Sequence, residues 1–217
     1  MGRSVDAIRV NEALGFPGLF CKYCIQRPRM PIGPMQAWRH EYSPNPFRGG
    51  HMKQLLLLRH AKSSWDEPGI SDHDRPLNNR GRRNAPAMGG VIMSEGIVPD
   101  LIVSSTATRT RETVELVSAE FDADVQIVFD EAIYHAAPGT LMARIRTTPD
   151  QVGTLMLVGH NPGMEELVHQ LTGKFESFPT GALAAMSIDT DQWSDFGLVD
   201  LVMNQLGLWK PRELEDD

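Results

Sequence analysis

Two arginines and two histidines each follow a strongly apolar segment, and these four residues are the best candidates for chemistry. Arg59 and His60 follow the run Leu55–Leu58. Arg109 comes shortly after DLIVSS (100–105), and His160 directly follows TLMLVG (154–159). Ligands of open α/β sheets bind beyond the carboxyl ends of the strands. If these segments are parallel neighbouring strands, we expect the four side chains to converge on one pocket.

Such a pocket would bind an anion, and phosphate fits it best. Guanidinium groups donate in a planar, bidentate way to phosphoryl oxygens, and a helix beginning after His160 would add backbone donors. A neutral imidazole is a competent nucleophile, and nearby arginines favour the neutral form. We expect His60 to attack phosphorus in line, giving a phosphohistidine that water then hydrolyses. Arg59, Arg109 and His160 would hold the oxygens.

Each of these signals alone has a simpler explanation. An Arg-His pair after a strand can belong to a solvated loop, and GHNP (159–162) can be only a turn and helix cap. Arg109 could lie on an exposed helix face and pair with Glu112 or Glu115. The shared place of the motifs at strand ends favours the catalytic interpretation.

The segments that would position these residues alternate between strand and helix from Met52 onward. Strands are expected at 54–58, 100–105, 125–129, 154–159, 183–188 and 198–203. Apolar residues at helical spacing predict helices with the faces Ala85–Met88–Gly89–Ile92, Thr110–Thr113–Val114–Val117, Leu141–Ile145 and Met164–Leu167–Val168–Leu171. Asn161 is expected to cap the last of these, with Pro162 at its first position. The alternation indicates an α/β sheet covered by helices on both faces.

The motifs LLLLRHAKSSW, VSSTATRTRETVE and LVGHNPGMEEL together resemble the histidine phosphatase superfamily, and best its small SixA-type phosphohistidine phosphatases. The resemblance covers residues 52–217 and none of 1–51. It implies a three-layer α/β sandwich with a mostly parallel central sheet. It also implies a phosphorylated His60, phosphate binding by Arg59, Arg109 and His160, and no metal or other cofactor. The segment 72–86 resembles the family stretch that leads into the first long helix.

The sequence departs from the family pattern at two positions, and a third point concerns the general acid. Ala61 stands where the family has glycine, and Thr106 where it has proline. Many relatives use a glutamate after the third strand, and Glu131 is the nearest candidate here; a solvated carboxylate is the alternative. SixA-type proteins can do without a carboxylic acid, because the P–N bond of their substrate is labile.

The rim of the pocket would set the substrate. Lys62 and Ser63 are expected to bind phosphate or substrate there, and the other expected rim residues are Trp65, His73, Arg75 and His135. The chain after Met52 has no long insertion that could form a lid, which favours phosphohistidine on a signalling protein and disfavours a phosphoglycerate mutase. The alternatives are a phosphatase for small phosphoesters or phosphorylated serine or threonine, and a non-catalytic phosphate-binding module. Binding alone would not need His60.

Composition and charge exclude several other classes of function. The chain is 41% hydrophobic and 23% charged, as in globular proteins, and no apolar run approaches the roughly 20 residues of a membrane span. Two cysteines give no disulfide framework, so a reducing, cytoplasmic location is expected. Residues 1–51 carry seven Lys and Arg against three Asp and Glu, a net charge of +4. Because the whole chain carries −7, residues 52–217 carry −11. Such an acidic body disfavours nucleic-acid binding, and nucleotide-binding glycine motifs are missing.

Residues 1–51 are expected to be a poorly ordered extension, because they are rich in turn motifs and lack periodicity. Cys21 and Cys24 could be half of a zinc site, but a second pair is missing, so two ordinary thiols are the simpler interpretation. A transit peptide is a further alternative. Another is a mis-assigned start, because Arg48–Gly50 can be encoded by a purine-rich, ribosome-binding stretch just before the Met52 codon.

Overall fold

A computed structural model describes residues 52–66, 68–198 and 201–211 of the chain. The expected extension at 1–51, with its two cysteines, lies outside the described residues. The strands of the described part are β1 (Met52–Arg59), β2 (Leu101–Ser104), β3 (Gln126–Phe129), β4 (Thr154–Gly159), β5 (Leu183–Asp189) and β6 (Met203–Trp209). Its helices are α1 (Asn79–Ser94), α2 (Thr108–Ser118), α3 (Pro138–Arg146) and α4 (Gly163–Thr172), with short 3₁₀ helices η2 (Glu131–Ile133) and η3 (Trp193–Asp195).

The strands form one sheet in the order β3-β2-β4-β1-β5-β6. The first four in this order run parallel, and β5 and β6 are antiparallel additions at one side. The expected mostly parallel α/β sheet is therefore confirmed. Strand β1 lies between β4 and β5, so its residues Leu55–Leu58 are shielded on both faces and at both edges.

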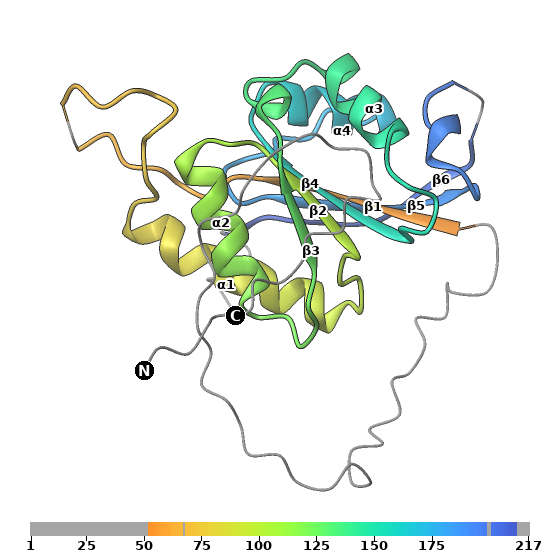
Figure 1. The fold of residues 1–217 in the computed structure, drawn as a ribbon, viewed down its shortest axis with the longest axis horizontal. Helices are drawn as coiled ribbons and strands as arrows, with labels where there is room; N and C mark the ends of the chain where they lie inside the picture. The colour runs from red at the N-terminus through yellow and green to blue at the C-terminus, as the bar shows by residue number, and fades with distance from the viewer. Residues whose placement is uncertain (1–51, 67, 199–200, 212–217) are drawn as a thin grey trace, which may run out of the picture. The chain divides into compact units, whose positions relative to one another are not determined.

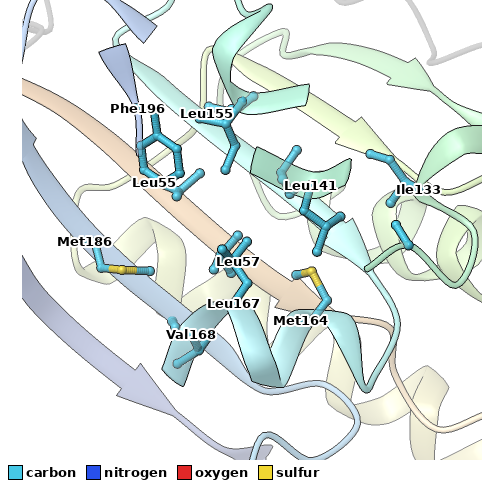
Figure 2. Packing of buried hydrophobic residues seen from close by; sticks show 14 of the residues in the cluster. Leu55, Leu57, Ile133, Leu141, Leu155, Met164, Leu167, Val168, Met186 and Phe196 are labelled. Carbon is cyan, nitrogen blue, oxygen red and sulfur yellow. The ribbon is translucent and has the colours of Figure 1, made fainter. Parts of the chain in front are cut away.

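Alternate residues of β1 enter two separate hydrophobic cores. Leu56 and Leu58 pack with the apolar faces of α1 and α2, whereas Leu55 and Leu57 pack with those of α3 and α4. Figure 1 shows the two helix pairs on opposite sides of the sheet. Figure 2 shows Leu167 and Val168 of α4 beside the sheet residues Leu57 and Met186. These layers confirm the expected three-layer sandwich.

Two local expectations were wrong. The last strand is not 198–203 but Met203–Trp209, because the residues that pair with β5 belong to the later stretch, and Val202 is 62% exposed. Asn161 does not cap α4: Pro162 holds the cap position, and no side chain accepts there. The Asn161 amide instead donates to Glu165 Oε2 at 3.1 Å and to the Phe178 carbonyl at 3.0 Å.

The carboxyl ends of the parallel strands meet at one edge of the sheet. Arg59 of β1 pairs in register with Gly159 of β4, and Ser104 of β2 pairs with Val158 of β4. The residues that follow therefore come together, as the strand-end argument predicted. The described part of the chain contains no helix long and apolar enough to cross a membrane.

Candidate active site

The loops that follow β1 and β4 bring His60 and His160 into a buried pair. The ring centroids lie 5.1 Å apart, and only 7% of His60 and 3% of His160 is exposed. The His60 backbone N–H donates to the Gly159 carbonyl at 3.1 Å, which ties the two strand ends together.

One ring nitrogen of His60 is engaged, and the other has no hydrogen bond within the part of the chain that the structure describes. Nδ1 lies 2.7 Å from the Ala61 carbonyl. A carbonyl can only accept, so Nδ1 carries the hydrogen and Nε2 holds the lone pair. Burial, reinforced by the nearby Arg109, Arg59 and Arg75 and opposed by the hydrogen bond to the Ala61 carbonyl, lowers the pKa of His60 to about 3. The imidazole is therefore neutral and nucleophilic at physiological pH.

His160 has the opposite tautomer. Its Nδ1 accepts from Arg109 Nη2 at 3.2 Å, so its Nε2 carries the hydrogen and donates to Ser105 Oγ at 2.9 Å. Burial lowers the pKa of His160 to about 2, with additional effects of His60 and Arg109. His160 is a neutral donor in this arrangement.

Arg109 is buried and faces the site, so the alternative of an exposed, helix-face arginine is wrong. It is 2% exposed and donates from Nη2 to Asp72 Oδ2 at 2.9 Å and from Nη1 to the Asp72 carbonyl. Glu112, one of the carboxylates considered as its partner, instead pairs with Arg82 at 2.9 Å.

Arg59 lies partly exposed at the end of β1, and one of its buried donors is unused. Nη1 donates to the Phe178 carbonyl at 2.8 Å, whereas Nε is buried without a hydrogen-bond partner among the described residues. Burial lowers the pKa of Arg59, opposed by Glu165 and reinforced by Arg109. An orphaned guanidinium donor beside a neutral histidine pair is suited to a bound oxyanion.

Lys62 and Ser63, which were expected to contact substrate, lie in different environments. Ser63 is 6% exposed, and its Oγ accepts from Arg75 Nη2 at 2.7 Å, so its position supports the loop. The Lys62 side chain is exposed. Trp65 is 74% exposed, and the Arg75 guanidinium covers one face of its ring at 3.2 Å from the centroid.

Asp72 is the site residue that the sequence did not reveal. Its carboxylate accepts from Arg75 Nη1 at 2.7 Å, from Arg109 Nη2 at 2.9 Å, from the Tyr134 hydroxyl at 2.8 Å and from His135 Nε2 at 3.2 Å. Although burial opposes it, these hydrogen bonds hold the pKa of Asp72 well below its usual range. Asp72 thus joins α2, its own loop and the loop after β3. The only sequence signal was the carboxylate three residues before Arg75 in DHDR.

Glu131 lies on η2, after β3, and is exposed. Among the described residues, no hydrogen bond or ion pair links its side chain to the histidine pair. From the same segment, Tyr134 and His135 are the residues that reach His160, with ring centroids 5.4 Å and 5.1 Å away. Within the described ranges, no group of three or more His, Cys, Asp or Glu could hold a metal ion.

The two departures from the family motifs leave the site assembled. Ala61 is fully buried, and its N–H donates to Thr113 Oγ1 at 3.0 Å. Among the described residues other than glycine, only His135 has a positive φ. Ala61 therefore has a backbone conformation that does not require glycine. Thr106 precedes α2, and its Oγ1 lies 3.0 Å from His73 Nε2.

Comparison with known proteins places this geometry in context. Residues 55–177 match the model of the histidine phosphatase superfamily, branch 1. The crystal structure of a protein named as the phosphohistidine phosphatase SixA from Agrobacterium tumefaciens superposes with a TM-score of 0.61 at 32% identity, over 73% of this chain and 98% of that one. An uncharacterized chloroplastic protein of Arabidopsis thaliana is 35% identical, over 66% of this chain and 70% of its own length. An uncharacterized protein of Mycobacterium tuberculosis is 36% identical, over 64% and 90%.

Proposed function

The chain belongs to the histidine phosphatase superfamily, and from this premise we propose that it removes phosphoryl groups from protein histidines with His60 as its nucleophile. The observation that carries the proposal is the state of His60: it is buried and neutral, its Nδ1 is held by the Ala61 carbonyl, and its Nε2 is free. A residue that only bound phosphate would not need this lone pair.

In the proposed first step, His60 Nε2 forms a bond to phosphorus while the bond from phosphorus to the leaving nitrogen or oxygen breaks. Arg59, Arg109 and His160 hold the phosphoryl oxygens: the N–H of His160 Nε2 exchanges Ser105 Oγ for a phosphoryl oxygen, and Arg59 Nε would gain the acceptor it lacks. In the second step, water attacks phosphorus and the bond to His60 breaks, releasing phosphate. Positioning and electrostatics dominate such transfers.

The protein-borne substrate is supported by the open mouth of the site. The side chains of Asp72 and His135, next to the histidine pair, are 40% and 50% exposed. A P–N bond is also suited to a site whose central carboxylate, Asp72, stays ionised and cannot donate a proton. The name of the structural relative from Agrobacterium tumefaciens points to the same substrate class. A cytoplasmic location remains a prediction from the composition.

The test is a substrate panel combined with trapping of the phosphoenzyme. Phosphohistidine protein, phosphoserine and phosphothreonine peptides and small sugar phosphates are compared by phosphate release, and the enzyme is quenched rapidly to capture an acid-labile phosphoryl group. The wild type should favour phosphohistidine and trap phosphate, and His60→Ala should do neither. His169→Ala is the matched control, because His169 lies on α4 and stacks on Phe175. Equal turnover by His60→Ala would refute the nucleophile; a preference for another substrate would refute only the substrate class.

A further inference from the structure

Transfer from a poor leaving group needs a proton donor, and most groups around His160 cannot serve. Asp72 is ionised, with its pKa held well below its usual range. The Tyr134 hydroxyl donates to Asp72 at 2.8 Å, and burial raises its pKa. His60 and His160 are occupied as nucleophile and oxygen donor. Glu131, the candidate suggested by the sequence, lies on η2 and has no hydrogen bond or ion pair to the histidine pair or to Asp72 among the described residues.

We propose that His135 is the catalytic proton-transfer residue and that Asp72 is its positioning residue. The His135 ring lies 5.1 Å from that of His160 between centroids, and its side chain is 50% exposed, which places it at the mouth where a leaving group departs. His135 Nε2 lies 3.2 Å from Asp72 Oδ2. A carboxylate only accepts, so Nε2 carries a hydrogen and Nδ1 is the nitrogen that exchanges a proton.

The backbone holds His135 in an unusual conformation. Its φ is 50°, in the left-handed region that few residues other than glycine adopt, although asparagine, aspartate and histidine are enriched there. The next residue is held as well: a Cβ added to Gly163 would lie 1.9 Å from the Ala136 carbonyl oxygen. The loop therefore packs directly on the start of α4, beside His160. Strained residues that their surroundings hold in place cluster at active sites.

The chemistry rests on the proposed function and balances over its two steps. As His60 Nε2 bonds to phosphorus, the proton on His135 Nδ1 moves to the leaving atom. As water attacks the phosphohistidine, His135 Nδ1 takes a proton from that water, and the P–N bond electrons return to His60. His135 ends as it began, and the net reaction is hydrolysis. Acting as acid and then as base is the usual role of such a group.

The experiment compares substrates that differ in their need for the proton. The ratio of kcat/KM for 4-nitrophenyl phosphate to that for an alkyl phosphate is measured in the wild type and in His135→Asn, chosen because asparagine tolerates the left-handed backbone. General acid catalysis contributes about 10²–10⁴-fold, so the variant should lose about 10²-fold or more on the alkyl ester and little on the nitrophenyl ester. His135→Gly, which also accepts this φ, is the second variant.

Two further variants complete the test. Asp72→Asn should change the ratio in the same direction as His135→Asn. His169→Gln is the matched control, because His169 lies on α4 and stacks on Phe175, away from Asp72 and His135 in the hydrogen-bond network; it should keep the wild-type ratio. Equal losses on both esters in the two His135 variants, or no loss at all, would overturn the assignment. Absence of a trapped phosphoenzyme in the wild type would instead overturn the proposed function.

Discussion

Hydrogen bonds to the two buried histidines give them different tautomers and therefore different uses. Ala61 accepts from Nδ1 of His60, which frees Nε2. Arg109 donates to Nδ1 of His160, which turns Nε2 into a donor. If the partner at Nδ1 of either ring changed from an acceptor to a donor, or the reverse, the lone pair and the hydrogen on Nε2 would be exchanged. The residues around each ring therefore matter as much as the imidazoles themselves.

Arg59→Lys and Arg109→Lys are each expected to lower kcat/KM about 10²–10³-fold, by analogy with the loss of one oxyanion donor. Lysine keeps the charge but cannot bond to two acceptors through a planar fork, as Arg109 does with the backbone carbonyl and the carboxylate of Asp72. Steady-state kinetics on 4-nitrophenyl phosphate give the comparison. Arg83→Lys, an exposed residue of α1, is the control. Near-normal rates in both site variants would show that charge alone is sufficient.

Acid should destabilise the protein through its two buried histidines. Their pKa values are lowered from 6.5 to about 3 for His60 and about 2 for His160, so below pH 6.5 the unfolded chain binds protons that the folded chain does not. Stability is therefore full above that pH and lost as the pH falls toward the folded values, by roughly 1.4 kcal/mol per pH unit for each histidine. The stability that ionised Asp72 contributes is lost in a lower pH range, only below its ordinary pKa of 3.8.

Urea unfolding between pH 6 and 4.5 measures this dependence. The slope of unfolding free energy against pH should be shallower in His160→Gln than in the wild type by roughly 1.4 kcal/mol per pH unit. Identical slopes would mean that His160 is protonated in the folded protein, and its assigned tautomer would then be wrong.

The strand-end residues could be predicted from sequence, and His135 was expected at the rim of the site, but Asp72 and Tyr134 were not predicted. Arg59, His60 and His160 are adjacent to buried strands, and strand order alone brings them together. Asp72 and Tyr134 reach the site from loops whose paths depend on contacts far apart in the chain. Asp72 and Tyr134, for example, are 62 residues apart, and local patterns contain no record of such contacts.

At the scale of elements, periodicity predicted the buried segments better than the edge of the sheet. Strand β4 has the expected bounds because all six of its residues are buried. Strand β6 lies at an edge and alternates between exposed and half-buried residues, so its apolar signal was weak and the prediction began too early. The start of α4 was mispredicted for a different reason: the Asn161 side chain bonds to Glu165 and the Phe178 loop, and these are tertiary contacts.

Gly163→Ala tests how the loop after β3 is seated on α4. A Cβ there would overlap the Ala136 carbonyl, so the loop that carries Tyr134 and His135 must shift. Overpacking of this kind costs about 1–3 kcal/mol, and kcat/KM should fall as well. Urea unfolding and kinetics are measured beside Gly90→Ala, an exposed position of α1 with open space around its Cβ. That control should gain about 0.5–1 kcal/mol. Similar behaviour of the two variants would contradict the close contact.

At the scale of the whole molecule, the architecture follows from where β1 lies. It is the first strand of the described chain, yet it pairs with β4 on one side and β5 on the other. Its residues enter both hydrophobic cores. The alternation of strands and helices predicted two covered faces, and the run of four leucines predicted a strand that is covered on both faces.

Removing residues 1–51 is expected to leave the protein folded and active, because β1 begins at Met52 and the described cores draw on residues from Leu55 onward. Thermal melting and turnover of 4-nitrophenyl phosphate are compared between the full chain and a chain that starts at Met52.

A chain that starts at Leu55 is the control. It loses the pairs of Met52 and Lys53 with β5 and the bonds of Lys53 to the Asp150 and Val152 carbonyls, so its melting temperature should fall, by about 2–4 °C for each kcal/mol of lost stability. If the Met52 chain instead melted as low as this control, or lost its turnover, the preceding residues would be a working part of the phosphatase and the domain boundary at Met52 would be wrong.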